Sequence, residues 1–264
     1  MSFKGRYPFR IGCTSYVIPD DLLPNVRFMA DTVDDIELVL FESGKWSNLP
    51  DERTVASMQR IADKHDITYS VHFPIDRRAG ADDPEERAAF QRYVAAIIRL
   101  TAELPLSGYL LHLEGLDDEN DPGELRRWKT ACTAFCEQLN DSFPDVHTKI
   151  CVENLGYTPE LHAELVETFH FSHCVDIGHL WNAQYSWKEY LAQVLEHTKI
   201  IHLHGVAGGK DHQSLQLHAQ QEQIQDLMPF LRSYGGVLTL EVFSEEATFS
   251  SLAHFGERWR QSPS

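Results

Sequence analysis

The stretch that decides the fold class is FSHCVDIGHLWNAQYSWKEYLAQVLEHTKIIHLH, residues 171–204. Two short apolar runs, 171–177 and 199–204, flank an amphipathic segment at 186–197 that begins with polar residues. A strand, a helix and a second strand in this order predict a βαβ unit, in which the two strands are parallel. One face of this unit must be buried against further units of the same kind.

The same alternation extends through the rest of the chain. Apolar helical periodicity marks 51–65, 82–104 and 121–139, in addition to 186–197. The predicted strands are 10–16, 34–41, 67–73, 108–113, 148–153, 171–177, 199–204 and 236–243. Eight such units in 264 residues are typical of a (β/α)₈ TIM barrel. We therefore expect an α/β fold with a single barrel domain over residues 1–264, and a doubly wound open sheet is the alternative.

Composition and charge restrict the environment and the partners. Apolar residues make up 42% of the chain, and no run approaches the ~18 consecutive apolar residues of a membrane span. The first residues lack the apolar core of a signal peptide, and the five cysteines are odd in number with no CxxC pair. These features predict a cytoplasmic protein with reduced thiols and no membrane partner. The net charge of −17 repels phosphate backbones, so we expect no nucleic-acid partner, and the sequence leaves the oligomeric state open.

Six successive strands place an imidazole or a carboxylate near their carboxyl ends, where barrel enzymes build their active sites. Several buried acids would repel one another, and a divalent cation removes this penalty. Histidine and carboxylate ligands favour Zn²⁺, with Mn²⁺ or Fe²⁺ as alternatives. The residues are His72, His112, Glu153, Asp176 with His179 three positions on, His202, and Glu241, and the loop after His202 adds Asp211 and His212.

Each residue also has a simpler interpretation when it is taken singly. A strand histidine such as His72 is more often a hydrogen-bonded core residue, and Glu153 is equally suited to capping a helix. Glu37 is compatible with the site or with a salt bridge. Of the two histidines of 199–204, we expect only His202 to face the barrel axis, and His204 to support it or to pack. Three aromatic residues that follow strand ends, Trp46, Tyr157 and Trp181, are expected mainly to pack.

The ordered set resembles that of the xylose isomerase-like barrels, which include endonuclease IV-type enzymes and sugar isomerases and epimerases. Glu153, Asp176, His202 and Glu241 are similar to the single-metal site of the epimerase branch. The fuller set resembles the endonuclease IV branch, which implies phosphodiester hydrolysis with up to three zinc ions and catalytic roles for Glu153, His179, Asp211 and His212. In that branch one residue separates the loop Asp and His, whereas Asp211 and His212 are adjacent, so we expect one to three ions.

The N-terminal third carries a narrower resemblance. GCTSYVIPDDLLPNVRFMADTVDDIELVLFES, residues 12–43, followed by NLP at 48–50, is similar to the cobamide-remodelling phosphodiesterases, the CbiR family. This resemblance implies a small-molecule corrinoid substrate, such as adenosylcobalamin or pseudo-B12, whose nucleotide loop is hydrolysed to cobinamide phosphate and a lower-ligand nucleoside. A sugar isomerase or epimerase with one metal, and a corrinoid or sugar binder without activity, remain the alternatives.

Overall fold

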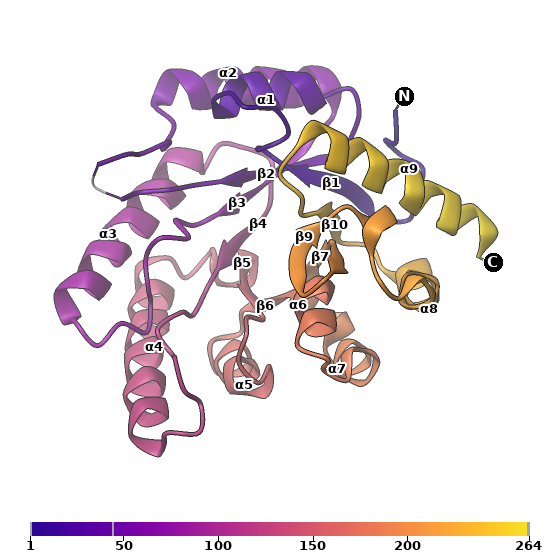
Figure 1. The fold of residues 1–264 in the computed structure, drawn as a ribbon. Coiled ribbons are helices and arrows are strands. Elements are labelled where there is room, and N and C mark those ends of the chain that lie inside the picture. The colour runs from indigo at the N-terminus through magenta and orange to yellow at the C-terminus, as the bar shows by residue number, and fades with distance from the viewer. Residues whose placement is uncertain (1, 44, 263–264) are drawn as a thin grey trace.

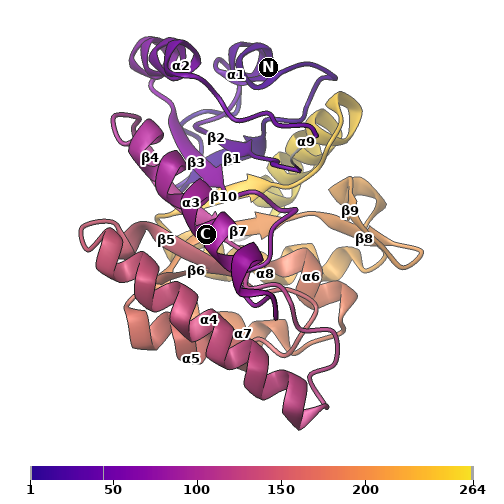
Figure 2. The same ribbon diagram turned by 90° about the vertical axis from the view of Figure 1, so that its left-hand side faces the viewer.

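The computed structural model describes residues 2–43 and 45–262, and it shows a closed barrel of eight parallel strands. The strands follow one another around the barrel in chain order, and the last pairs with the first. Helices surround the strands (Figure 1), and a view turned by 90° shows them packed along the outside of the barrel (Figure 2). The barrel strands are β1 (Arg10–Thr14), β2 (Asp35–Val39), β3 (Thr68–His72), β4 (Leu106–Leu111), β5 (Ile150–Glu153), β6 (Ser172–Asp176), β7 (Thr198–Leu203) and β10 (Val237–Leu240). The predicted TIM barrel is therefore confirmed.

The helices that connect the strands begin at signals visible in the sequence. Asp51, Asp83 and Asp121 each cap a helix by accepting a backbone N–H, and Pro84 and Pro122 occupy first-turn positions that need no N–H donor. The helices are α1 (Leu22–Met29), α2 (Glu52–His65), α3 (Pro84–Thr101), α4 (Pro122–Ser142), α5 (Glu160–Phe169), α6 (Ile177–Asn182), α7 (Trp187–Val194), α8 (Gln221–Ser233) and α9 (Glu245–Gln261). Three short 3₁₀ turns cover His147–Lys149, Leu195–His197 and Leu215–Leu217. Within the described residues, no helix combines the length and the apolar character that a membrane crossing requires.

The inside of the barrel is a packed layer rather than a pore. A compact cluster of fully or nearly fully buried side chains, separate from the larger core between strands and helices, consists of Leu110, Cys151, Cys174, Ile200 and Val237. Gly108 faces the same space, since a Cβ there would lie 2.9 Å from Cys151 Sγ and 3.0 Å from Ile200 Cδ1. Side chains two residues apart on a strand share a face. The residue two positions after each cluster member on β4 to β7 therefore also faces the interior, one layer closer to the carboxyl ends of the strands.

One segment differs from the sequence-based prediction. The glycine-rich loop after β7 is a two-stranded antiparallel hairpin, β8 (Gly205–Ala207) and β9 (Lys210–Gln213). Its two-residue turn is Gly208–Gly209, and both glycines have positive φ, at 60° and 74°. A hairpin turn with positive φ at both central residues suits the twist of its strands, and glycine adopts that conformation at little cost. The hairpin holds Asp211 and His212 on a defined strand.

Candidate metal centre

The predicted ligands on the barrel strands meet in one layer at the carboxyl ends. His112, Glu153, Asp176 and His202 each stand two positions after a member of the interior cluster. His72 and Glu241 complete the layer from β3 and from the residue that follows β10. The carboxyl ends of the strands thus bring six side chains, distant in sequence, above an apolar floor.

The first group has the composition of a cation site. Glu153, Asp176, His202 and Glu241 each offer one ligand atom, and these four atoms lie within 4.8 Å of one another. His202 Nδ1 lies 3.2 Å from Glu241 Oε2, 3.4 Å from Glu153 Oε2 and 3.8 Å from Asp176 Oδ2. All four side chains are buried. Three carboxylates and one imidazole nitrogen suit Zn²⁺, Mn²⁺ or Fe²⁺.

The second group shares Glu153 with the first. His72 Nε2 and His112 Nε2 lie 3.1 Å apart, and they are 3.6 Å and 3.2 Å from Glu153 Oε2. Burial alone would lower the pKa of His112, but the carboxylates of Glu153 and Glu114 raise it to about 10. A divalent cation and protons therefore compete for the same nitrogen lone pairs, as at other histidine-containing metal sites.

The third group consists of imidazoles alone. His179, His204 and His212 place one nitrogen each within 4.8 Å of the other two, and the rings of His204 and His212 have centroids 4.2 Å apart. The expectation that only one of His202 and His204 faces the axis is wrong, because residues two apart on a strand share a face. Both are fully buried, and His204 Nε2 lies 3.2 Å from Asp176 Oδ1. Asp211 belongs to no such group within residues 2–43 and 45–262, although the sequence suggested it as a ligand.

Hydrogen bonds at Nδ1 orient four of these histidines. The Nδ1 atoms of His72, His179 and His212 lie 2.8, 3.1 and 3.2 Å from the backbone oxygens of Phe73, Asn154 and Glu241, respectively. His112 Nδ1 lies 3.3 Å from Glu114 Oε1. In a neutral imidazole, an Nδ1–H that donates to oxygen leaves a lone pair on Nε2. This second contact is the usual support of a metal-binding histidine.

His204 is compatible with two tautomers. The His212 backbone N–H donates to its Nδ1 at 2.9 Å, which places the proton on Nε2, facing Asp176. Its Nδ1 is also 3.2 Å from the Gly205 oxygen, and donation to that oxygen would free Nε2 as a ligand. Burial alone would lower the pKa of His204, but Asp176 raises it to about 9.

The position of unpaired buried polar atoms supports the binding of cations at this layer. Buried polar atoms without a hydrogen-bond partner are concentrated in this layer, whereas buried polar atoms are ordinarily paired. They include Glu153 Oε1 and Oε2, Asp176 Oδ2, His202 Nδ1, His204 Nε2 and Glu241 Oε2. Burial alone would raise the pKa of Glu153, but His202 and His112 hold it well below its usual range, so the carboxylate is charged. The residues present fit divalent cations.

Sequence reasoning missed or underrated three neighbours of the site. Glu37 Oε2 lies 2.8 Å from His202 Nε2 deep in the barrel, and its position on 34–41 was the signal available. His204 was expected to face away from His202, whereas it lies beside Asp176 in the same layer. Cys174 forms a group with Glu153 and His202 from the layer below, but burial raises the pKa of its thiol well above the usual value, and a protonated thiol is a poor ligand.

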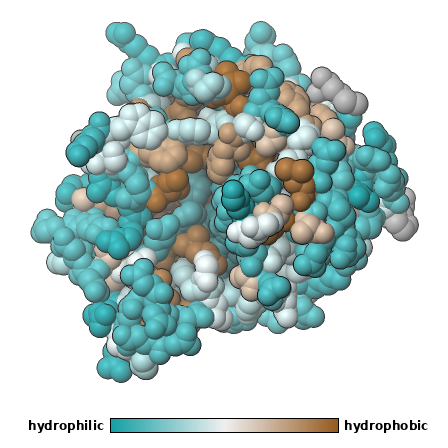
Figure 3. All heavy atoms as spheres, in the orientation of Figure 1, coloured by the Kyte–Doolittle hydropathy of each residue, from teal (hydrophilic) through white to brown (hydrophobic). Residues whose placement is uncertain are grey.

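The aromatic residues near the strand ends mostly pack, as expected. Trp181 is buried and stacks on His218 with ring centroids 4.2 Å apart, and Tyr157 packs edge-on against Trp128. Trp46, by contrast, is 55% exposed. In Figure 3 the rim of the face seen in Figure 1 is mostly hydrophilic, and apolar residues gather nearer its centre.

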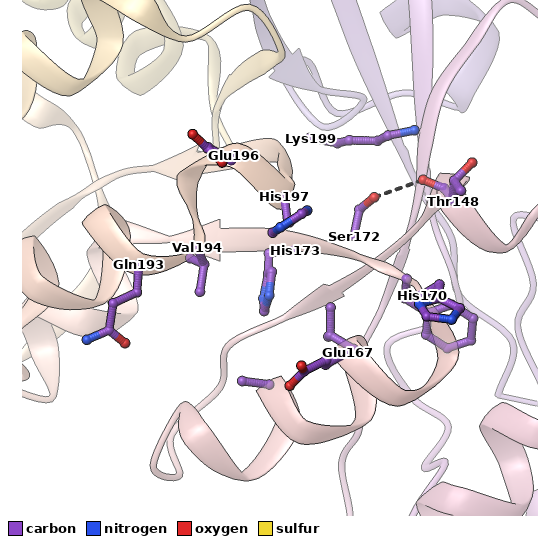
Figure 4. A pocket seen from close by; sticks show the side chains of 13 residues that line it. Thr148, Glu167, His170, Ser172, His173, Gln193, Val194, Glu196, His197 and Lys199 are labelled. Atoms are coloured by element: carbon purple, nitrogen blue, oxygen red, sulfur yellow. Dashed lines mark hydrogen bonds between the residues drawn. The ribbon is translucent and has the colours of Figure 1, made fainter.

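Two cavities differ in their relation to the ligands. A cleft of about 520 Å³ lies between the loops that follow β4 and β5, where Glu114, the partner of His112, is part of its lining. A second cavity, of about 530 Å³, lies at the opposite, amino-terminal ends of β6 and β7 (Figure 4). Its lining includes His173, His197 and Lys199 but none of the candidate ligands. The first cleft lies at the carboxyl ends beside the metal groups, and a further cavity of about 410 Å³ at the same ends has His212 itself in its lining.

Comparison with known proteins agrees with this geometry. The family model described as "Xylose isomerase-like TIM barrel" matches residues 28–262. The chain belongs to the xylose isomerase-like TIM barrel family. No curated protein sequence matches it.

Solved structures of similar fold belong to proteins that are described by different activities. A D-tagatose 3-epimerase-like protein is 19% identical, with 96% of this chain and 99% of that chain covered and a TM-score of 0.78. The 3-keto-D-glucoside 4-epimerase of E. coli is 14% identical, with coverages of 95% and 98% and a TM-score of 0.73. A family 2 AP endonuclease from Brucella melitensis is 14% identical, with coverages of 94% and 98% and a TM-score of 0.71. At these identities the likeness shows the fold shared by the xylose isomerase-like family. The activity must be inferred from the residues of the site.

Proposed function

We propose that this chain is a divalent-metal-dependent phosphodiesterase that acts on the nucleotide loop of a corrinoid. The observation that carries the proposal is the pair of His72 and His112. Their Nε2 atoms lie 3.1 Å apart, and the Nδ1 atom of each contacts an oxygen acceptor. The two Nε2 lone pairs beside the Glu153 carboxylate repel each other unless a cation or an added proton lies between them. An enzyme with one cation at Glu153, Asp176, His202 and Glu241 would not use this second group as metal ligands.

Phosphodiester hydrolysis is the reaction that this arrangement suits best. Glu153 stands between the two groups and can contribute a carboxylate oxygen to each. Divalent cations, when bound, would neutralise the charge on the phosphate oxygens and promote attack by water. His72 and His112 would hold one side of the centre, while Asp176, His202 and Glu241 would hold the other. His179, His204 and His212 supply a third set of nitrogen ligands beside Asp176.

The proposed substrate rests on charge and on the N-terminal resemblance. A net charge of −17 disfavours a long polyanion, which argues against DNA. A corrinoid carries a single phosphodiester, and residues 12–43 resemble the cobamide-remodelling phosphodiesterases. Hydrolysis would add one water across a P–O bond and give cobinamide phosphate and a lower-ligand nucleoside.

A sugar isomerase or epimerase is the second candidate. The four-residue group at Glu153, Asp176, His202 and Glu241 is sufficient for a single cation. Several of the solved structures that share this fold are described as sugar epimerases, which supports the second candidate, whereas the group at His72 and His112 supports the first. In this case His72 and His112 would contact substrate hydroxyls and would not bind metal.

One experiment separates the two candidates. Protein loaded with Zn²⁺, Mn²⁺ or Fe²⁺ is incubated with adenosylcobalamin and pseudo-B12, and the products are identified by mass spectrometry. In parallel, ketopentoses and ketohexoses are tested for epimerisation by chromatography. Cobinamide phosphate that appears with metal and is absent after chelation supports the phosphodiesterase. Epimerised sugar without corrinoid turnover supports the second candidate and overturns the first.

A further inference from the structure

Glu37 is a buried carboxylate on the opposite side of the barrel interior from most of the candidate ligands. It lies on β2, where it is paired in register with Thr14 of β1 and Ser70 of β3, and its side chain is completely inaccessible to solvent. No predicted ligand comes from β1 or β2. A carboxylate in such a place is costly to bury unless it is paired, so its partner defines its role.

That partner is the Nε2 atom of His202, one of the candidate ligands. Glu37 Oε2 lies 2.8 Å from His202 Nε2. A carboxylate accepts hydrogen bonds, so the contact places a proton on Nε2. The other nitrogen, Nδ1, then faces Glu241 Oε2 at 3.2 Å and Glu153 Oε2 at 3.4 Å. His202 thus differs from His72, whose Nδ1 contacts a backbone oxygen and whose Nε2 lies 3.6 Å from Glu153 Oε2.

We propose that Glu37 is a positioning residue that fixes His202 as an Nδ1 ligand of the cation held with Glu153, Asp176 and Glu241. The hydrogen bond to the carboxyl oxygen behind the ring strengthens Nδ1 as an electron-pair donor and holds the plane of the ring. The inference rests on the proposed metal dependence of the site, and it holds for either candidate reaction.

Asp35 offers a matched control on the same strand. It stands two residues before Glu37, faces the same interior and is equally buried. Its oxygens, however, accept hydrogen bonds from the hydroxyl groups of Thr68, Ser70 and Ser107, and it contacts no candidate ligand. Removing the Asp35 charge tests the cost of a lost buried carboxylate on β2 without altering His202.

The test compares Glu37→Gln with Asp35→Asn by chelator competition for Zn²⁺. We expect Glu37→Gln to weaken the affinity for one bound equivalent ~10–100-fold, the range typical of lost outer contacts to a metal-binding histidine. We expect Asp35→Asn to leave zinc affinity within about twofold of the wild type, whatever its effect on thermal stability. Equal zinc affinities in Glu37→Gln and the wild type would overturn the proposal.

A measurement on the unmodified protein keeps the proposal testable if Glu37→Gln does not fold. Long-range ¹H–¹⁵N correlation spectra of the zinc-loaded wild type report which nitrogen of each histidine carries hydrogen. We expect His202 to show Nε2–H with a metal-bound Nδ1, and His72 to show the reverse. A His202 bound through Nε2 would contradict the proposal. Neither readout involves a substrate, so failure of the phosphodiesterase assay and failure of this inference are distinguishable.

Discussion

Gly178 lies directly against the imidazole ring of His204. A Cβ at position 178 would come within 2.2 Å of His204 Cε1 and 2.4 Å of both ring nitrogens, far inside van der Waals contact. Gly178 belongs to the first turn of α6, which Asp176 begins by accepting the His179 N–H at 2.7 Å. The absence of a side chain at this one position lets the helix that carries His179 approach the strand end that carries His204.

Gly178→Ala should therefore displace His204 and disrupt the three-histidine group. We expect a loss of ~1–3 kcal/mol in the free energy of unfolding, as for other overpacked sites, together with the loss of one bound zinc equivalent. Gly235→Ala is the control, because a Cβ at that position meets no atom within 4 Å. Denaturant titration and elemental analysis of both variants check the prediction, which fails if the alanine at 178 leaves zinc content and stability unchanged.

A second prediction separates the two neighbours on the hairpin. His212→Ala removes one of the three imidazoles and should lower the zinc content by one equivalent. Asp211→Asn should leave the zinc content unchanged, because Asp211 joins no candidate group in the described part of the chain. Elemental analysis after dialysis against buffered zinc measures both. Loss of metal in Asp211→Asn would restore the role that the sequence suggested for this residue.

The barrel was predictable because each of its units carries its own signal. Capping aspartates at 51, 83 and 121 begin three of the helices, and short apolar runs between helices mark the strands. The hairpin after β7 was not foreseen, although Gly208–Gly209 is a recognised turn signal. β8 has only three residues and β9 is polar throughout, so hydrophobic periodicity gives no indication of them.

The site was predictable only as far as strand ends could be aligned. His72, His112, Glu153, Asp176, His202 and Glu241 follow from the rule that the carboxyl ends of barrel strands converge. Contacts across the barrel are beyond such a rule. The pairing of Glu37 with His202 joins residues 165 positions apart and depends on the barrel's diameter and on rotamers. Asp211 and His212 are adjacent, but only His212 joins a group, and its positive φ of 48° is a departure from regular strand geometry that sequence alternation does not predict.

A third prediction addresses the second metal group. His72→Ala should lower the zinc content by one equivalent and abolish phosphodiesterase activity, because it leaves His112 and Glu153 with an incomplete set of ligands. His65→Ala is a suitable control, since His65 lies at the end of α2 and pairs with Asp31. If His72→Ala keeps the full zinc content and loses only sugar turnover, the residue binds substrate and the epimerase is favoured.

The last prediction concerns acid stability and involves a histidine outside the metal groups. His162 on α5 is completely buried, with Nε2 3.1 Å from the Tyr190 hydroxyl and Nδ1 without a hydrogen-bond partner. Burial lowers the pKa of His162 to about 3, whereas an unfolded histidine titrates near ~6.5. Below pH ~6.5 the unfolded chain therefore binds a proton at this residue, whereas the folded chain does not. The free energy of unfolding then falls by up to ~1.4 kcal/mol per pH unit until the pH approaches 3.

His162→Gln removes this proton linkage and keeps a hydrogen-bonding group near Tyr190. Its free energy of unfolding should fall less steeply between pH 6.5 and pH 4 than that of the wild type, even if its stability at pH 8 is lower. Replacing the exposed His197 by glutamine is the control for a histidine substitution at the surface, and we expect it to leave the wild-type slope unchanged. Urea titrations of the three metal-free proteins across this range measure the slopes. Parallel curves for the wild type and His162→Gln would show that acid sensitivity originates elsewhere, most directly in the carboxylates of the metal centre.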